Sequence, residues 1–313
     1  MRVLSLDGGG VKGAMEARLL ERLENRAPFL DRVELFAGTS TGGILALALA
    51  AGVPIADCVA LYVENAARIF AARDMADRVA GGLDEYVRAN YAQDGLRATL
   101  EETFGAKRLP DLKRDVLLPS FDLARFRPKF LDRSDDWSLV DAALATSAAP
   151  TYLPVHIVRE TLSGRATSKG SVRALIDGGV FCNNPSKAAS DHARTKLGAK
   201  KVTTLSVGAG QTPYAPPEEL LSQASNILDW GFRQWVVKHP HLLLKVLFDG
   251  SVTAAHYSSR AEQGGDYHRI QPVLPEDVDL DSVSKVPLLL AVADAYDLED
   301  SIAWVKLNLA ADA

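Results

Sequence analysis

Ser40 is the residue of this sequence whose neighbours most clearly suggest chemistry. It lies in G-T-S-T-G, so that Gly38, Ser40 and Gly42 fit the pattern G-x-S-x-G. In that pattern a strand turns sharply into a helix and projects the serine side chain above the edge of a sheet. The flanking glycines leave room for a strained backbone and a substrate. The pattern indicates a serine nucleophile, and the alternative is a strand-to-helix connection with a helix-capping hydroxyl.

A serine nucleophile needs a base within hydrogen-bond distance. None of the six histidines follows a strand that ends in glycines, and each is better explained as a surface or capping residue. They are His156, His192, His239, His241, His256 and His268. Asp177 is the stronger candidate, because it ends an apolar stretch and precedes Gly178 and Gly179. Burial raises the pKa of a carboxyl group and suits it to accept the serine proton, although a D-G-G sequence is also typical of a plain tight turn.

Glycines also crowd the first turn of the chain. Gly8, Gly9, Gly10 and Gly13 directly follow Asp7 and the first apolar run. Acyl transfer to a serine places negative charge on the carbonyl oxygen, and backbone N–H groups stabilise that charge. Glycines let a substrate approach such groups, and the helix that follows adds positive potential at its N-terminus. We therefore predict an oxyanion hole at Gly8, Gly9 and Gly10, to which Lys12 either adds positive charge or is an ordinary surface lysine.

The same glycines allow a second interpretation. Gly8, Gly10 and Gly13 also fit the dinucleotide-binding pattern G-x-G-x-x-G after a first strand. That pattern requires an acidic residue at the end of the second strand. The second strand ends instead in Ala37 and Gly38, while Glu34 lies near its start. A nucleotide-binding module is therefore the weaker alternative.

The surrounding pattern predicts the elements that position these residues. Short apolar runs alternate with segments of helical periodicity, which favours a parallel sheet covered by helices. The expected strands span residues 2–6, 33–37, 115–123, 128–132, 172–180 and 201–210, and the expected helices span 13–26, 44–51, a segment from Pro54, 94–104, 138–149 and 185–197. In such sheets ligands bind beyond the carboxyl ends of the strands. Ser40 and Asp177 are thus expected at the same edge.

The composition limits the partners and the kinds of site that this chain can have. The 313 residues are 47% hydrophobic with a formal net charge of −5, which does not favour nucleic acid as a partner. Cys58 and Cys182 are too few for a disulfide framework or a zinc site, and we expect both to be reduced core residues. No signal peptide and no membrane-spanning run is recognised, so the default expectation is a cytoplasmic protein, with export by a signal-free route left open.

The last third of the sequence carries no recognised motif. From Pro216 it is expected to be largely helical, and residues 286–296 are expected to form a core helix. Residues 225–248 combine Trp230, Phe232 and Trp235 with cationic side chains. Such a segment packs on the core, lies on a membrane surface or caps an acyl site, and core packing is the expected case.

Taken together, the motifs resemble the patatin-like family of lipolytic acyl hydrolases. The resemblance rests on D-G-G-G-x-K-G at residues 7–13, the serine turn at 38–42 and D-G-G at 177–179, in that order. Two further stretches contribute, A-T-S-A-A-P-T-Y-L-P at 145–154 and N-N-P at 183–185. The resemblance covers about residues 1–210. It implies a three-layer α/β/α sandwich with a mostly parallel central sheet, and we expect residues 1–313 to form one domain with a helical part from about 216 to 313.

The resemblance also implies a mechanism. Ser40 would be the nucleophile and Asp177 the base of a dyad without a catalytic histidine or metal, and no cofactor is expected. The substrate would be a fatty acyl ester of a phospholipid or related membrane lipid, met at a membrane or micelle surface. An acyltransferase that uses the same dyad is the alternative, and the oligomeric state is left open.

Overall fold

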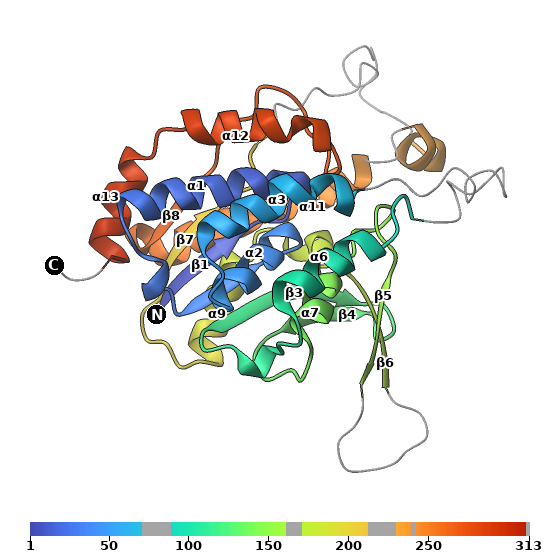
Figure 1. Cartoon of the computed structure of the whole chain (residues 1–313), viewed down its shortest axis with the longest axis horizontal. Coiled ribbons are helices and arrows are strands. Elements are labelled where there is room, and N and C mark those ends of the chain that lie inside the picture. The colour runs from blue at the N-terminus through green and yellow to red at the C-terminus, as the bar shows by residue number, and fades with distance from the viewer. Residues whose placement is uncertain (71–88, 161–170, 212–229, 239–241, 311–313) are drawn as a thin grey trace.

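The computed structural model describes residues 1–70, 89–160, 171–211, 230–238 and 242–310. The first part of the expected helical tail, residues 216–229, lies outside the described residues. Within the described part the chain forms a sheet with helices on both faces (Figure 1). The predicted three-layer α/β/α fold is confirmed.

The sheet has eight strands in the order β5-β6-β3-β2-β1-β7-β8, with β4 paired to β3 outside this path. The strands are β1 (Arg2–Leu6), β2 (Leu35–Gly38), β3 (Asp115–Asp122), β4 (Arg127–Leu131), β5 (His156–Glu160), β6 (Ser171–Asp177), β7 (Thr203–Val207) and β8 (Tyr267–Ile270). The run β3-β2-β1-β7-β8 is parallel throughout, whereas β4 and β6 are antiparallel to β3 and β5 is antiparallel to β6. The sheet is therefore parallel in its centre and mixed at one side.

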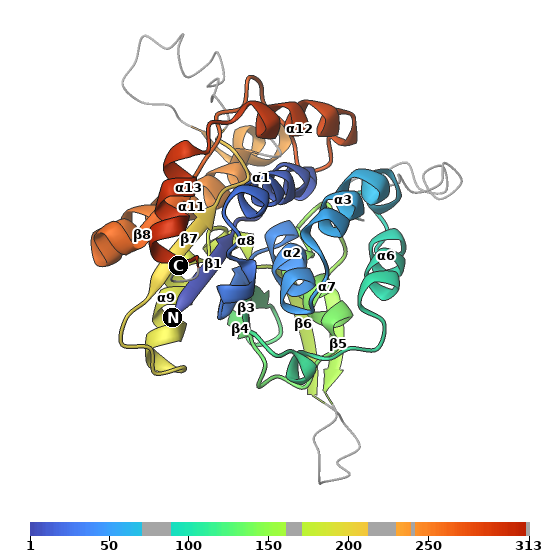
Figure 2. The same cartoon turned by 60° about the vertical axis from the view of Figure 1, so that its left-hand side comes forward.

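Helices cover the two faces unequally (Figure 2). The helices are α1 (Gly13–Arg26), α2 (Thr41–Ala50), α3 (Ile55–Ile69), α6 (Asp94–Phe104), α7 (Leu139–Ser147), α8 (Gly179–Cys182), α9 (Ser186–Thr195), α11 (Leu242–Gln263), α12 (Val286–Ala295) and α13 (Glu299–Asn308). The larger core lies between the sheet and α1, α2, α3, α6, α7, α12 and α13. The smaller core lies on the opposite face under α9, with α11 packed on α8 and α9.

Two helices of the larger core show why the sequence folds this way. In α1 the buried side chains include Met15, Leu19 and Leu23, which recur at helical spacing and face the core. In contrast, α2 (T-G-G-I-L-A-L-A-L-A) is apolar on all sides and almost entirely buried, because it lies between the sheet and the outer helices. Its position behind Ser40 gives the serine turn a rigid support.

Strand β6 reaches the functional edge by a route that the sequence analysis did not anticipate. The expectation was that Asp177 ends a strand running in the same direction as β2. Instead β6 is antiparallel to β3 and pairs Asp177 with Ser120. Ala37 of β2 is level with Leu117 of β3, so Ser120 is level with residue 40. Strand β6 runs toward the centre of the sheet from outside its edge and ends at Asp177. Asp177 is therefore level with Ser40.

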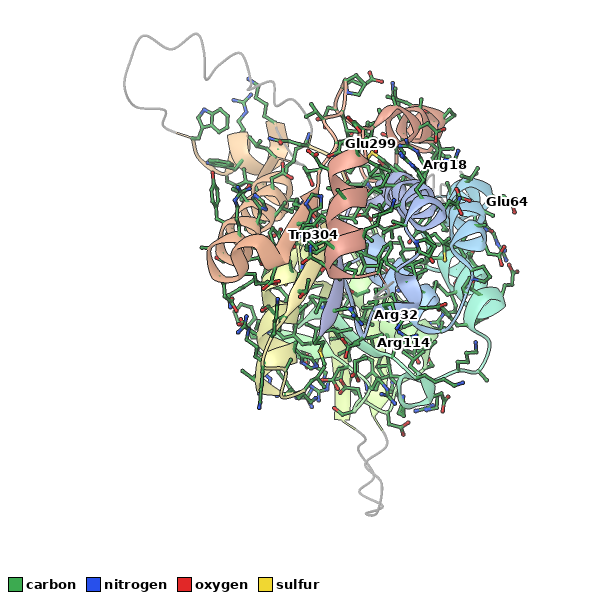
Figure 3. The ribbon with its side chains drawn as sticks, turned by 90° about the vertical axis from the view of Figure 1, so that its left-hand side faces the viewer. Arg18, Arg32, Glu64, Arg114, Glu299 and Trp304 are labelled. Atoms are coloured by element: carbon green, nitrogen blue, oxygen red, sulfur yellow. The ribbon has the colours of Figure 1, made fainter. Side chains whose placement is uncertain are left out.

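The C-terminal part contains a strand among its helices. Strand β8 extends the parallel sheet beside β7, and the sequence analysis missed it together with β5. Helix α13 lies against β8, where Trp304 stacks on His268 and donates a hydrogen bond to the Gly265 carbonyl (Figure 3). Helix α12 packs on α1 through one face only, so the expected core helix at 286–296 is half-buried.

Candidate active site

Ser40 occupies a strained turn between β2 and α2. Its φ of 55° and ψ of −124° lie in a region that non-glycine residues rarely adopt, at a cost of about 1–3 kcal/mol. The Ser40 amide donates to the Thr146 hydroxyl at 3.1 Å, and that hydroxyl donates to the Pro119 carbonyl at 2.6 Å. The neighbouring Thr39 hydroxyl donates to the Cys182 carbonyl at 2.7 Å. Surrounding segments thus hold Ser40 in its strained conformation.

The glycines flanking Ser40 are required by close backbone contacts. A Cβ atom at Gly38 would lie 2.1 Å from the Gly42 carbonyl oxygen, and one at Gly42 would lie 2.3 Å from the Asp7 carbonyl oxygen. A Cβ at Gly13 would lie 2.2 Å from the Thr41 hydroxyl oxygen. These contacts press the serine turn directly against the end of β1 and the start of α1. The predicted glycines therefore bring the two turns together.

Asp177 is buried beside Ser40. Its Oδ1 accepts a hydrogen bond from the Gly179 amide at 2.7 Å, and its own amide donates to the Ala148 carbonyl. Burial raises the pKa of Asp177 from 3.8 to about 7, against the lowering effect of hydrogen bonds from the Ser40 hydroxyl and the Gly179 amide. A carboxylate with this pKa is matched to proton transfer near neutral pH. Ser40 and Asp177, which are 137 residues apart in the sequence, are thus brought together.

The two glycines that follow Asp177, Gly178 and Gly179, are required by close contacts. A Cβ atom at Gly178 would lie 2.3 Å from the Pro119 carbonyl oxygen, so β3 and the end of β6 approach too closely for any side chain. Gly179 begins α8, and a Cβ there would lie 2.9 Å from Asn183 Oδ1 and 3.1 Å from Asp177 Oδ1. Both glycines therefore serve to position Asp177.

The first glycine turn is packed against other parts of the same chain. A Cβ atom would lie 2.2 Å from Asn183 Oδ1 at Gly8, 2.4 Å from Ala209 Cβ at Gly9 and 2.0 Å from the Leu280 carbonyl oxygen at Gly10. The glycines are therefore needed first for the protein's own packing. Asn183, Ala209 and Leu280 occupy the space beside the Cα atoms of these glycines, which the nucleotide-binding alternative reserves for a pyrophosphate.

The predicted oxyanion hole needs one correction. The Gly8 amide donates to the Asn183 carbonyl at 3.0 Å, so it is not available to a substrate. Within the described residues, the amides of Gly9 and Gly10 have no hydrogen-bond partner. Gly10 has a φ of 59° and lies with Ser40 in the wall of the same cleft. Two amides of the turn, rather than three, remain as candidate donors.

Asn183 is a positioning residue that the sequence analysis noted only as part of the family resemblance. Its backbone carbonyl accepts from the Gly8 amide, and its side-chain amide donates to the Gly8 carbonyl at 3.2 Å. Its own amide donates to the Ser251 hydroxyl of α11 at 3.0 Å. Asn183 therefore holds the Gly8 peptide from both sides and connects it to the C-terminal helices.

A buried charge cluster lies beneath the same turn. Arg269 of β8 donates to both carboxylate oxygens of Asp7, at 2.9 and 2.5 Å, and to Ser206 and Gln271. Glu16 accepts from the Asp7 amide, and burial holds its pKa well above the usual range. Nothing in the sequence pattern pointed to Arg269. Arg269 reaches Asp7 only because β8 pairs with β7 in the folded sheet.

Two clefts meet at the candidate site. The first, with a free volume of about 60 Å³, runs from Ser40 along apolar side chains of α2, α3 and α6, among them Ile44, Ile69 and Leu96. The second, with about 660 Å³, is lined about equally by polar and apolar groups, and its polar and charged lining includes Asn183, Lys12, Lys245, Asp249 and Arg260. Because it is the more polar of the two, we call it the polar cavity; Gly8 also lines it. Tyr152 and Leu280 line both. An apolar and a polar part of one ligand could therefore be held on either side of this junction.

Lys12 belongs to the polar cavity rather than to the open surface. Burial lowers the pKa of its ammonium group, and neighbouring Asp249 opposes this effect. Within the described residues Lys12 makes neither an ion pair nor a side-chain hydrogen bond. Its positive charge is directed into the cavity beside the glycine turn.

The histidines lie elsewhere. His156 is buried and contacts Asp141 and Gln93, so its assignment to the surface was wrong. His256 contacts the Tyr267 hydroxyl, His268 contacts the Ser301 hydroxyl, and His239 and His241 lie outside the described residues. Of the histidines that the structure describes, none hydrogen-bonds to Ser40 or Asp177. Both cysteines are free thiols; Cys58 is a buried core residue as predicted, whereas Cys182 is only partly buried.

The aromatic segment near residue 230 is more exposed than expected. Phe232 and Trp235 face solvent around the short helix η4 (Arg233–Lys238). Among the side chains of residues 225–248 that the structure describes, only Phe248 is buried. The prediction of core packing is thus wrong for Phe232 and Trp235. In the described part of the chain no helix is long and apolar enough to cross a bilayer. The same residues contain no group of three acidic, histidine or cysteine side chains that could hold a metal ion.

Comparison with known proteins agrees with the motifs. A sequence model of the family described as "Patatin-like phospholipase" matches residues 4–190. "Patatin-like protein 1" of Oryza sativa subsp. indica is 30% identical over 86% of this chain and 73% of its own length. The "cGAMP-activated phospholipase" of Pseudomonas aeruginosa (strain BWHPSA011 / Pa011) is 30% identical over 74% of this chain and 68% of its own length.

Among solved structures, VipD from Legionella pneumophila is similar over 93% of this chain and 66% of its own chain, with a TM-score of 0.42 and 12% sequence identity. The family match covers more than half of the chain, and it includes the serine turn, the D-G-G sequence and the first glycine turn. It ends before β7 and β8, so Arg269 lies outside it. On this evidence, the chain belongs to the patatin-like phospholipase family.

Proposed function

We propose that this protein is a serine lipid acyl hydrolase in which Ser40 is the nucleophile and Asp177 is the general base. Membership of a lipid acyl hydrolase family supports the class of reaction. The observation that carries the assignment is a strained serine beside a buried carboxyl group whose pKa is about 7. Strain at a nucleophile is expected where the fold must expose one hydroxyl to a substrate.

The proposed reaction proceeds through an acyl-enzyme. Asp177 takes the Ser40 proton as Oγ attacks the ester carbonyl, and the amides of Gly9 and Gly10 stabilise the negative oxygen. When the carbonyl re-forms, the alcohol leaves with the proton from Asp177, and the acyl group stays on Oγ. Water then attacks this ester, gives its proton to Asp177, and the proton returns to Ser40 as the free fatty acid is released. A histidine has no role in these steps.

The two clefts suggest how the substrate binds. The apolar cleft beside Ser40 suits the start of a fatty acyl chain, and the polar cavity suits a charged headgroup. Phospholipids and related membrane lipids combine both parts. We therefore propose them as the substrate class, with the acyl chain and headgroup diverging at Tyr152 and Leu280. The site of action would be a peripheral membrane surface reached from the cytoplasm.

The test uses a p-nitrophenyl ester and compares wild type with Ser40→Ala. The proposal expects nitrophenol release by wild type only, and the exposed Ser258→Ala is the matched control that keeps full activity. Asp177→Asn should lower turnover by roughly 10²–10⁴-fold, the usual effect of losing a general base. Equal release by wild type and Ser40→Ala, or complete loss on changing His192 or His268, would overturn the proposal. Product analysis with glycerol or lysolipid present would identify an acyltransferase instead.

A further inference from the structure

The turn between β3 and β4 exposes a phenylalanine in an unfavourable backbone conformation. Asp122 and Arg127 are the last cross-strand pair of this hairpin, and the turn projects beyond them. Phe126 in the turn has a φ of 49° and is 82% exposed. A positive φ is costly for a bulky side chain, and exposure of a phenyl ring to water is also unfavourable. Folding alone therefore gives no reason for a phenylalanine at this position.

Further exposed apolar side chains surround this turn. The hairpin patch comprises Leu123, Phe126, Phe130, Ile157 and Val172, which are each more than one-third exposed. Cross-strand pairs place Phe130 and Val172 on the sheet face that Phe121 occupies, since directly paired and alternate residues share a face. Phe121 packs edge-on against Phe126 at 5.6 Å between ring centroids. Phe121 therefore supports the exposed Phe126 ring, and Phe130 and Val172 add apolar side chains on the same face of the sheet.

Arginines beside the patch leave its surroundings with an excess of positive charge. Asp122 is buried and paired with Arg125 and Arg173. Arg127 and Arg159 are exposed, and in the described part of the chain neither forms an ion pair. Arg127 is the cross-strand partner of Asp122, so it lies at the tip of the hairpin on the opposite face from Phe121. Arg159 lies directly opposite Val172 in the sheet. The whole protein has a net charge of −5, so this local excess stands out against its average.

The hairpin patch lies at the catalytic edge of the sheet. Strand β3 is parallel to β2, so the β3–β4 turn leaves the sheet at the edge that carries Ser40 (Figure 1). Phe181 of α8, four residues after Asp177, packs against Phe121 and Phe130 with ring centroids 6.2 and 5.7 Å apart. The apolar base of the patch is therefore in contact with the short helix that begins at Gly179.

We propose that the hairpin patch docks the protein on an anionic lipid surface, with Phe126 inserted among the acyl chains and Arg127 and Arg159 facing the headgroups. An exposed aromatic ring flanked by cations matches the apolar and charged layers of such a surface. Docking there brings the edge that carries Ser40 close to the bilayer. This inference rests on the proposed hydrolase function, because a lipid substrate is what makes a docking surface useful.

The test separates binding from turnover by using full-length protein with the Ser40→Ala substitution. Its sedimentation is measured with phosphatidylcholine vesicles, with and without phosphatidylglycerol. Phe126→Gly keeps the left-handed turn and removes the ring, and we expect about tenfold weaker binding from the lost apolar burial. Arg127→Gln with Arg159→Gln should weaken binding only to anionic vesicles, by about fivefold for each arginine. Leu307→Ala on α13 and Arg32→Gln (Figure 3) are matched controls outside the patch and should bind normally.

Other outcomes would overturn the inference. Vesicle binding that is unchanged by both the Phe126 and the arginine substitutions would show that the hairpin patch is not the docking surface. A dimer that Phe126→Gly converts to a monomer, with vesicle binding intact, would assign the patch to a second copy of the chain. Hydrolysis of a water-soluble ester by Phe126→Gly with Ser40 intact should equal that of wild type. Failure of wild type to hydrolyse that ester would reject the hydrolase proposal, while the vesicle result would stand by itself.

Discussion

Replacing Asp177 with asparagine is the most informative perturbation of this protein, because above about pH 7 it should lower activity and raise stability. Asp177 is buried, and its pKa is raised from 3.8 to about 7, mainly by loss of hydration. The folded protein therefore resists ionisation of the group that the proposed mechanism requires as a base. Asparagine has nearly the same shape and carries no charge at any pH.

The size of the effect follows from the pKa difference. A group whose pKa is higher in the folded state contributes stability that is fully present below its unfolded pKa and is lost as pH rises through its folded pKa. For Asp177 this window runs from about pH 4 to about pH 7, and the total loss is about 4 kcal/mol at 1.36 kcal/mol per unit. Asp177→Asn has no group that titrates at this position, so its free energy of unfolding should not show this loss. An unsatisfied side-chain amide costs about 1–3 kcal/mol at every pH, so it lowers the whole curve without changing its slope.

Urea unfolding at a series of pH values between 4 and 8 would measure this difference. We expect the free energy of unfolding of Asp177→Asn, minus that of wild type, to rise by about 4 kcal/mol across the window and to stay constant above it. In parallel, kcat/KM of wild type should fall about tenfold per pH unit below about pH 7, as Asp177 becomes protonated. Asp191→Asn, an exposed carboxylate on α9, is the matched control that should leave the kinetic curve unchanged.

A flat difference in unfolding free energy would refute the reasoning, because it would mean that Asp177 has the same pKa in the folded and unfolded states. An acidic limb of kcat/KM near pH 4 would refute it as well. If the kinetic limb remained near pH 7 while the stability difference was flat, a group other than Asp177 would be the base.

Three further predictions concern the turns around the site. Gly10→Ala should lower kcat/KM at least tenfold, because its Cβ would lie 2.0 Å from the Leu280 carbonyl oxygen. The control is Gly52→Ala, at a position that also has a positive φ but has open space around it. That substitution should cost only about 1 kcal/mol of stability and no activity. Arg269→Met should lower the free energy of unfolding by about 3–5 kcal/mol by leaving Asp7 buried without its partner, and adding Asp7→Asn should recover part of that loss in urea titrations. Ser40→Gly and Ser40→Ala should both be inactive, but thermal unfolding should find the glycine variant more stable by about 1 kcal/mol, because glycine relieves the positive φ.

Some features of the site could be predicted because they are local. A short apolar run, a glycine-flanked serine and an apolar helix define the Ser40 turn within about fifteen consecutive residues. The same holds for the first glycine turn and for the D-G-G sequence. Asp177 was identified by elimination of the histidines, and its expected position was right although the expected strand direction was wrong.

Other features depend on partners far away in the sequence. The Gly8 amide is closed off by Asn183, which no local pattern around Gly8 reveals. Strand β8 is short and follows a long helix, so its sequence alone does not predict a strand. It forms one because β7 provides an edge to pair with. The exposed ring of Phe126 could not be told from a core phenylalanine, because it lies in the turn before β4, where no strand alternation indicates which side a residue faces.

The sequence by itself thus determined the fold class, the two glycine turns, the serine and the carboxylate, since each depends on backbone preferences and residue order within a short stretch. Only the tertiary structure decided which amides remain free, which cation neutralises Asp7, how β6 delivers Asp177 to the level of Ser40, and where apolar side chains stay exposed. The physical reason is that hydrogen-bond partners, burial and the resulting pKa values belong to pairs of distant segments. These properties do not exist until the sheet has brought those segments together.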